Sequence, residues 1–332
     1  MERIHVKVPG EQPQDREYMK QALALAEKGH GWVNPNPMVG AVLVKDGRII
    51  GEGYHTRYGQ LHAEREAFKN AAERGEETAG ADLYVTLEPC CHTGKQPPCT
   101  EAVLASGVKR VIVGCTDPNP VVAGRGIRLL REKGLEVVAG VLRGECERQN
   151  EVFFHFMRTK LPFTVLKYAM TLDGKTATVS GKSQWITGEA ARKRVHEDRE
   201  RYMAILTGVS TVLADNPQLT CRIPGGKNPI RVIADTKLRT PLSSTVVQTA
   251  RETPTWIVTA VSDVGRKEAY EDAGCRVLSV PAKEGELDLQ AMMQRLGEEK
   301  VDSVMVESGG TLAWSFLKAG LVNRVQAYIA PK

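Results

Sequence analysis

The sequence predicts an α/β protein made of two domains. Its 332 residues exceed the length of about 150 that is typical of one domain. In both halves, short apolar runs with the period of a strand alternate with longer runs that have the period of a helix. The hydrophobic content of 42% is sufficient for ordinary cores. We place the domains at residues 1–148 and 149–332.

Composition narrows the class of protein. The net charge of +5 permits an anionic small-molecule substrate, and no Lys/Arg run with interleaved aromatic residues predicts a nucleic-acid groove. The charged run 192–201 mixes both signs, which is typical of a solvated helix face. No apolar run approaches the roughly 20 residues of a membrane span, and residues 1–7 lack the apolar core of a signal peptide. With seven cysteines in no disulfide pattern, we expect a cytoplasmic protein.

The first half predicts helices and strands in alternation. Apolar residues at helical spacing predict a helix over Asp15–Lys28, which Gly29 ends. The turn Lys45-Asp46-Gly47-Arg48 predicts a hairpin of the strands Val39–Val44 and Ile49–Tyr54. The elements that follow are a helix from His62 to Arg74, a strand Asp82–Leu87, a helix from Cys99 to Ser106, a strand Lys109–Cys115, a helix Gly126–Lys133 and a strand Leu135–Ala139. This order predicts a mixed sheet with helices on both faces.

The second half repeats the alternation. The apolar run Glu151–Phe156 predicts a helix rather than a free linker. Strands are expected at Phe163–Ala169, Ala204–Thr207, Ile230–Asp235, Thr255–Thr259, Arg276–Ser279, Ser303–Glu307 and Arg324–Ile329. Helices are expected at Gly188–Arg201, Val209–Leu213, Leu287–Leu296 and Thr311–Ala319. No GxGxxG motif follows a strand, so a conventional dinucleotide fold is not supported.

One stretch of the first half carries the strongest chemical signal. His62-Ala63-Glu64 is followed by Pro89-Cys90 and, nine residues after Cys90, by Pro98-Cys99. One histidine and two cysteines, with a glutamate two residues after the histidine, form the signature of a zinc deaminase. Three protein ligands leave the fourth position on zinc for water, which zinc activates near neutral pH. We therefore predict that His62, Cys90 and Cys99 bind Zn²⁺.

The glutamate has a different role, and its surroundings leave one choice open. Glu64 is placed to take the proton of the attacking water and to deliver it to the ring and the leaving amine. Cys91 and His92 are alternative ligands, but the Pro-Cys step favours Cys90. We expect His62, Cys90 and Cys99 each at the start of a helix, where thiolates are favoured.

These motifs resemble the cytidine-deaminase superfamily, and three further features narrow the resemblance. The gap between the two cysteines is eight residues, Asn34-Pro35-Asn36-Pro37 precedes the hairpin, and Gly53-Tyr54-His55 precedes the HAE motif. Together they are similar to the deaminase half of the bifunctional riboflavin-biosynthesis deaminase/reductases. The resemblance implies a pyrimidine ribosyl phosphate substrate and a pocket lined by Asn34 and His55, for which turn and loop roles are the alternatives. The turn Gly124-Arg125-Gly126 could hold the phosphate on backbone N–H groups or be a plain helix entry.

The second half resembles the reductase half of the same family. The resemblance is carried by residues 166–175, by Ser183-Gln184-Trp185-Ile186-Thr187 and by residues 208–222. It implies a fold similar to dihydrofolate reductase. The residues implied to contact NADPH are Ala169, Trp185, Thr211, Asp215, Gly309, Gly310 and Thr311. The residues implied to contact the substrate are Ser183, Arg199, Leu219, Arg222 and Glu307. The sequence ends at Lys332, where the family usually continues with at least one more strand.

The expected function is therefore a two-step one. Zinc-dependent hydrolytic deamination of 2,5-diamino-6-ribosylamino-4(3H)-pyrimidinone 5′-phosphate would be followed by NADPH-dependent reduction of its ribosyl group to ribityl. We also expect a homo-oligomer that binds neither nucleic acid nor membranes. The alternatives are a nucleoside or nucleic-acid deaminase with an appended domain, and a zinc-stabilised binding protein, in which zinc would have four protein ligands.

Overall fold

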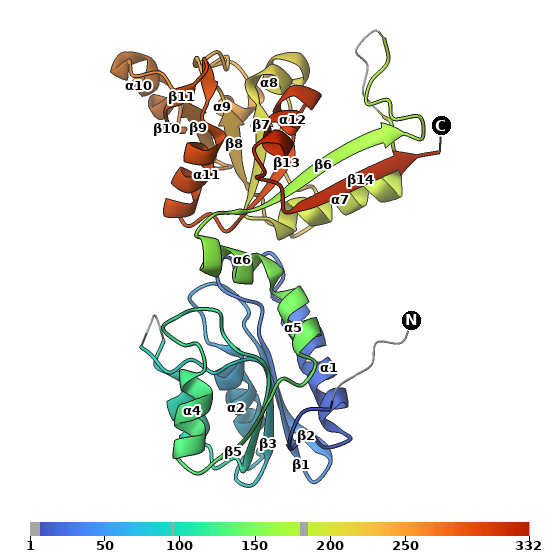
Figure 1. The fold of residues 1–332 in the computed structure, drawn as a ribbon, viewed down its shortest axis with the longest axis vertical. Helices are drawn as coiled ribbons and strands as arrows, with labels where there is room; N and C mark the ends of the chain where they lie inside the picture. Colours follow the sequence, from blue (N-terminus) through green and yellow to red (C-terminus); the bar gives the residue numbers. More distant parts are fainter. Residues whose placement is uncertain (1–6, 94–95, 180–184, 332) are drawn as a thin grey trace. The chain divides into compact units, whose positions relative to one another are not determined.

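The computed structural model describes residues 7–93, 96–179 and 185–331. It divides the chain into two compact units, Met1–Arg158 and Thr159–Lys332 (Figure 1). The domain boundary expected at residue 148 precedes helix α6 (Glu151–Thr159), whereas the compact units divide near the end of that helix. The earlier boundary stays a prediction.

The first unit contains a five-stranded mixed sheet with the order β2-β1-β3-β4-β5. Its strands are β1 (Gly40–Lys45), β2 (Arg48–Tyr54), β3 (Asp82–Leu87), β4 (Arg110–Cys115) and β5 (Glu136–Ala139). β1 pairs antiparallel with β2 and β3, whereas β3, β4 and β5 are parallel. Because β3 and β4 are parallel neighbours, the loops that follow them lie at the same edge of the sheet.

Helices cover both faces of this sheet, as the blue and green ribbons of Figure 1 show. α2 (Ala63–Glu73), α3 (Cys99–Ala105) and α4 (Arg125–Glu132) contribute to the core on one face. α1 (Asp15–Glu27), α5 (Arg143–Gln149) and α6 contribute to the core on the other face, where α6 buries Phe153 and Phe154. The three expected layers are therefore confirmed.

The backbone of α2 approaches the sheet unusually closely. The fully buried apolar residues of α2 are all alanines, Ala63, Ala67 and Ala71. A Cβ atom added at Gly53 of β2 would lie 2.3 Å from the backbone nitrogen of Ala67 and 2.4 Å from the carbonyl oxygen of Ala63. Only glycine fits there, so this contact fixes the distance of the helix from the sheet.

The second unit contains a seven-stranded sheet with the order β10-β9-β8-β7-β13-β6-β14, in which every neighbouring pair is parallel. The strands are β6 (Phe163–Thr171), β7 (Ala204–Gly208), β8 (Ile230–Ala234), β9 (Thr255–Thr259), β10 (Arg276–Ser279), β13 (Ser303–Glu307) and β14 (Arg324–Ala330), and β11 (Ala282–Lys283) and β12 (Glu286–Leu287) form a separate hairpin. The helices are α7 (Glu189–Arg201), α8 (Val209–Asp215), α9 (Thr245–Gln248), α10 (Val264–Asp272), α11 (Leu289–Glu298) and α12 (Gly310–Lys318).

The predicted α/β class is confirmed, and each strand predicted in the second half occurs within two residues of its expected ends. Sequence periodicity missed α5, α9, α10 and the β11–β12 hairpin. α5 buries a single residue, Cys146, in an otherwise charged sequence, and α9 has only four residues, so neither presents a full apolar stripe. None of the described helices is long and apolar enough to cross a membrane.

Substitution of Gly53 by alanine tests the contact between α2 and β2. The added methyl group would meet the α2 backbone, so we expect a loss of roughly 1–3 kcal/mol of stability, the usual cost of overpacking. Because His62 is the N-cap of α2, zinc retention should fall as well. Thermal unfolding and metal analysis of the purified variant measure the two effects.

Gly144→Ala provides the matched control in the same unit. A Cβ atom at Gly144 meets only the flexible end of Arg148, at 3.3 Å, and the position lies in helix α5, where alanine is preferred to glycine. This variant should keep its zinc and its melting temperature. If Gly53→Ala and Gly144→Ala have the same stability and zinc content, the contact between α2 and Gly53 does not fix the position of the helix.

Candidate functional site

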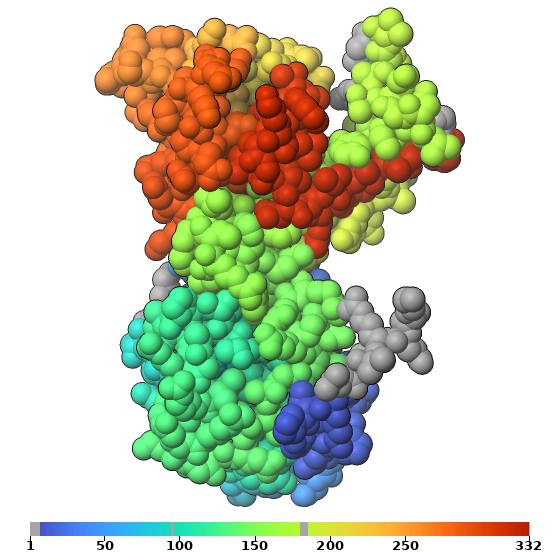
Figure 2. Space-filling model, viewed as in Figure 1, coloured from blue at the N-terminus to red at the C-terminus, as the bar shows by residue number. Residues whose placement is uncertain are grey.

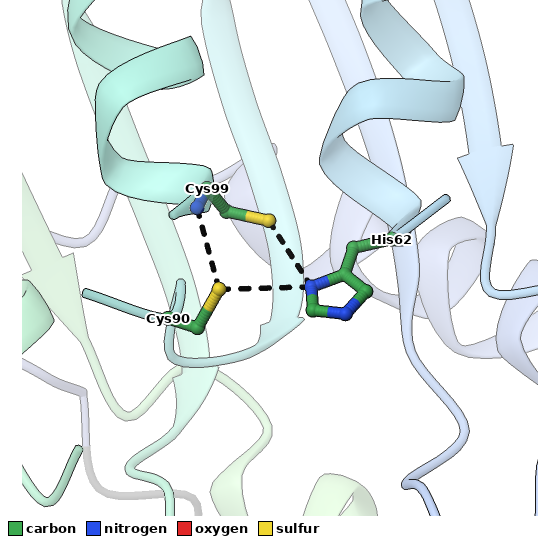
Figure 3. A group of neighbouring side chains, drawn as sticks. All are labelled: His62, Cys90 and Cys99. Atoms are coloured by element: carbon green, nitrogen blue, oxygen red, sulfur yellow. Dashed lines mark hydrogen bonds between the residues drawn. The ribbon is translucent and has the colours of Figure 1, made fainter. Parts of the chain in front are cut away.

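Three elements of the first unit bring His62, Cys90 and Cys99 together (Figure 3). His62 is the N-cap of α2 and Cys99 is the first residue of α3, directly after Pro98. Cys90 lies in the turn after β3, and its carbonyl oxygen accepts the backbone N–H of Thr100. The expected helix starts are thus confirmed for His62 and Cys99. The expectation for Cys90 is wrong, because its loop is held by α3 instead of entering a helix.

The donor atoms of these residues suit a single tetrahedral ion. His62 Nδ1 lies 3.6 Å from Cys90 Sγ and 3.3 Å from Cys99 Sγ, and all three donor atoms lie within 4.8 Å of one another. Zinc bonds of about 2.0–2.3 Å to nitrogen and sulfur require ligand separations in this range. Among the described residues, neither Cys91 nor His92 belongs to such a group.

Hydrogen bonds within the cluster favour a thiolate at Cys90. Its sulfur accepts hydrogen bonds from the Cys99 side chain and from the Cys99 backbone N–H, which lies 3.3 Å away, and these bonds together with His62 lower the pKa of Cys90 to about 4. The interaction with Cys90 also raises the pKa of His62. Thiolate is the form that binds zinc, so Cys90 is suited to ligate a cation. The hydrogen bond to Cys90 and burial raise the pKa of Cys99, so Cys99 would give up its proton when a cation binds.

Glu64 lies beside the cluster in the first turn of α2. It is 3% exposed, and burial raises the pKa of its carboxyl group. A carboxyl group whose pKa is raised toward neutrality is suited to exchange protons, as a general acid–base residue must. Glu64, His62 and Cys90 all line a cavity of about 250 Å³.

His55 also lines this cavity, held by both ring nitrogens. Its Nδ1 lies 2.9 Å from the carbonyl oxygen of Leu61, and its Nε2 lies 3.1 Å from Asn36 Nδ2. The carbonyl can only accept, so Nδ1 carries the proton and Nε2 accepts from the amide. Asn36, which the sequence analysis missed, lines the cavity. Asn34 is not among the lining residues, so its expected substrate contact gains no support here.

The loop after β4 closes another side of the cavity with Asp117 and Asn119. Burial raises the pKa of Asp117 to about 6. Neither residue carries a functional signal in the sequence. The available signal was the parallel order of β3 and β4, which places the loops containing Cys90 and Asp117 at one edge of the sheet.

The turn Gly124-Arg125-Gly126 is a helix entry. The backbone N–H groups of Gly124 and Ile127 donate to the carboxylate of Glu88, at 2.8 and 3.1 Å. Because a carboxylate of the chain itself already accepts from this turn, the suggested phosphate site there is wrong.

In the second unit, six of the seven residues expected to contact a cofactor, all except Trp185, lie at one edge of the sheet. β7, β13 and β6 are adjacent and parallel, so their carboxyl ends lie together. Ala169 lies near the end of β6, Thr211 and Asp215 lie in α8, which follows β7, and Gly309, Gly310 and Thr311 form the start of α12, which follows β13. Figure 2 shows a hollow between red α12 and the residues that follow β6.

A charged cluster is formed by residues of β6, β13 and α7. The guanidinium of Arg199 donates twice to Glu307, at 2.8 and 3.0 Å, and Lys167 Nζ lies 3.2 Å from the same carboxylate. Burial alone would raise the pKa of Glu307, but the charges of Arg199 and Lys167 lower it to about 2. Lys167 was missed in the sequence because a lone lysine in a strand carries no signal.

Of the remaining expected residues, the structure describes Leu219, Arg222 and Trp185. Leu219 is buried with φ of 54°, and the backbone N–H of Arg222 lies 3.3 Å from His196 Nδ1. Trp185 is 61% exposed and stacks on Arg192, with 4.8 Å between the guanidinium and the ring centroid. Ser183 lies outside the described residues.

Two arginines fix the loop that contains Leu219. Arg199 donates to the carbonyl of Thr220 at 3.0 Å, and the fully buried Arg231 donates to the carbonyl of Gln218 at 3.2 Å. Arg231 is itself held by hydrogen bonds to Thr249 and Thr253. The loop is therefore anchored on both sides of Leu219 by buried side chains.

Two family models match the chain. The cytidine and deoxycytidylate deaminase zinc-binding region matches residues 12–115, and the RibD C-terminal domain matches residues 162–332. The first range contains the His62 cluster and Glu64, and the second contains the Glu307 cluster.

Curated relatives and solved structures match almost the full chain. A riboflavin biosynthesis protein RibD from Actinobacillus pleuropneumoniae is 51% identical over 96% of this chain and 84% of its own length. The Escherichia coli RibD is 44% identical over 96% of this chain and 88% of its own length.

The crystal structure of a diaminohydroxyphosphoribosylaminopyrimidine deaminase/5-amino-6-(5-phosphoribosylamino)uracil reductase from Thermotoga maritima has a TM-score of 0.85 and 42% identity, over 96% of this chain and 87% of its own. A RibD structure from Acinetobacter baumannii has the same TM-score with 38% identity, over 96% of this chain and 87% of its own. With two family models and these relatives in agreement, the chain belongs to the RibD family of riboflavin biosynthesis proteins.

Proposed function

We propose which residues perform the two reactions of this bifunctional deaminase and reductase of riboflavin biosynthesis. The proposal for the first unit rests on one observation, the convergence of His62, Cys90 and Cys99 beside the buried Glu64. The three ligands would hold zinc and leave one position open on the side of the cavity. Bound zinc would supply a nucleophile by lowering the pKa of water to about 7.

Glu64 would move the protons of the deamination. Its carboxylate would take the first proton of the attacking water and deliver it to the ring nitrogen, and would then pass the proton of the hydroxyl left on the ring carbon to the leaving amine. The buried environment that raises the pKa of Glu64 supports this role, because the same group must accept and then release a proton. Asn36, His55, Asp117 and Asn119 would surround the pyrimidine, since they line the same cavity.

The substrate class follows from the family. We infer that the first unit deaminates 2,5-diamino-6-ribosylamino-4(3H)-pyrimidinone 5′-phosphate, as the name of the Thermotoga maritima relative suggests. The second unit would then reduce the ribosyl group to ribityl. The homo-oligomeric state and the cytoplasmic location stay predictions.

For the second unit we propose NADPH at the edge formed by β6, β7 and β13. Bound NADPH would supply the hydride. The starts of α8 and α12 present backbone N–H groups suited to phosphate, which supports Thr211, Gly309, Gly310 and Thr311 as contacts. Ala169, Asp215 and Trp185 would complete the cofactor site. Leu219, Arg222 and the pair Arg199–Glu307 would orient the sugar phosphate, together with Ser183.

The direct test is incubation of the purified, zinc-loaded chain with the diaminopyrimidine phosphate. Ammonia release and NADPH oxidation are followed together. We expect ammonia to be released even when NADPH is absent. NADPH should be oxidised only after the substrate has been deaminated. Absence of ammonia release would reject the proposed function.

Substitution of Glu64 by glutamine tests its catalytic role. The amide keeps the shape of the side chain but cannot transfer the proton, so deamination should fall by about 10²–10⁴-fold. Zinc content should be unchanged, because Glu64 is not a proposed ligand. Reduction of separately supplied, deaminated substrate should keep its rate, and loss of both activities would contradict the separation of the two sites.

The charge balance at Glu307 predicts an acid-sensitive stability. A carboxylate whose pKa is lowered from 4.5 to about 2 stabilises the fold above pH 4.5, and this contribution is lost as the pH falls toward 2. We expect a loss of up to about 3 kcal/mol over that window. Glu307→Gln should show a weaker dependence there and reduced reductase activity, because the charges of Arg199 and Lys167 are no longer balanced.

Urea unfolding at pH 5 and pH 3, followed by tryptophan fluorescence, measures this effect. The control is Glu268→Gln, because Glu268 is an exposed residue of α10 in the same unit. It should retain the pH dependence of the unchanged protein. If Glu307→Gln retains it too, the Glu307 cluster does not carry the acid sensitivity.

A further inference from the structure

Glu88 is a buried carboxylate that the proposed chemistry does not use. It directly follows β3 and is 3% exposed. Its Oε2 accepts the backbone N–H groups of Asp117 at 3.2 Å and Gly124 at 2.8 Å, and its Oε1 accepts that of Ile127 at 3.1 Å. All three donors are main-chain groups, so the carboxylate fixes the backbone of the segment that contains them.

The three donors belong to one segment, the loop after β4 and the first turn of α4. This segment contains Asp117 and Asn119, which form one wall of the deaminase cavity. Within the loop, Asp117 accepts the backbone N–H of Asn119 at 2.7 Å, and Asn119 accepts that of Val121 at 3.1 Å. The position of the wall therefore depends on where Glu88 holds the two ends of the loop.

A second contact limits the movement of the same segment. A Cβ atom at Gly126 would lie 2.2 Å from the carbonyl oxygen of Pro89 and 3.3 Å from Glu88 Oε1. The start of α4 thus lies directly against the Glu-Pro-Cys turn. Two residues after Glu88 the same turn presents Cys90. One short turn therefore places both a metal ligand and the wall formed by Asp117 and Asn119.

We propose that Glu88 is a positioning residue for the pyrimidine substrate: its carboxylate holds the 117–124 loop so that Asp117 and Asn119 face the substrate. The inference rests on the proposed deaminase function. Glu88 also lines the cavity, but its carboxylate accepts three backbone N–H groups, so the inference assigns it a positioning role and no metal contact. Loss of its carboxylate should weaken substrate binding and leave the zinc ligands in place.

Glu88→Gln is the first test. Glutamine has one accepting oxygen and an NH₂ group, which would face backbone donors, so at least one of the three hydrogen bonds is lost. We expect the KM for the diaminopyrimidine phosphate to rise by about tenfold. The kcat should change by less than about threefold, because zinc and Glu64 are unchanged. One zinc per chain and the rate of the reductase step should be retained.

A direct binding measurement gives the affinity for the substrate alone, whereas KM also depends on turnover. In a Glu64→Gln background the substrate binds without turnover, so calorimetry gives its Kd with and without Glu88→Gln. The double variant should bind about tenfold more weakly. Glu11→Gln is the matched control, because Glu11 is also a buried carboxylate that accepts a backbone N–H, from Val8, but lies outside the residues that line the cavity. Its Kd and KM should not change.

The outcomes separate this inference from the function itself. Absence of ammonia release by the unchanged chain rejects the proposed function. An active chain whose Glu88→Gln variant keeps its KM and Kd overturns only the role of Glu88, and so does a variant that loses zinc. Glu88→Asp, which keeps the charge on a shorter side chain, should also raise KM. If neither Glu88→Gln nor Glu88→Asp folds, the role of Glu88 is purely structural and the inference is overturned.

Discussion

The deaminase site depends on the contact between the backbone of α2 and Gly53 of β2. Because the fully buried apolar residues of α2 are all alanines, the helix lies within backbone distance of the strand. Its N-terminus, with His62 and Glu64, is thereby placed opposite the turn that carries Cys90. A larger residue on either surface would move one imidazole and one carboxylate together, away from the two sulfurs. The metal cluster thus relies on the smallest side chains of the core.

The two units use the same architectural rule for different chemistry. In each unit, parallel strands end at one edge of a sheet, and the loops and helices that follow them carry candidate site residues. In the first unit this edge holds soft donors and a buried carboxylate, which suit zinc and proton transfer. In the second unit it holds helix starts rich in glycine and an ionic cluster in which Lys167 and Arg199 share the carboxylate of Glu307. Strand order alone therefore locates both candidate sites, and residue type distinguishes them.

The sequence was most informative where chemistry and spacing coincide. His62, Cys90 and Cys99 could be predicted because metal binding permits few residue types, and the strands because their apolar runs are distinct. Asn36 and Glu88 could not be predicted, since their importance arises from hydrogen bonds to residues distant in the sequence. The expected helix start at Cys90 was wrong for a related reason: the carbonyl oxygen of Cys90 accepts the backbone N–H of Thr100, a residue of another element, α3. Local patterns do not contain such partners.

The anchoring of the loop around Leu219 has an energetic consequence for the second unit. Arg199 and Arg231 hold the carbonyls on either side of Leu219, and Leu219 keeps a left-handed backbone conformation between them. A ligand that arrives there meets a surface whose conformational entropy was already lost during folding. Binding energy is then not consumed in ordering the chain, and affinity depends on how well the ligand matches a rigid template.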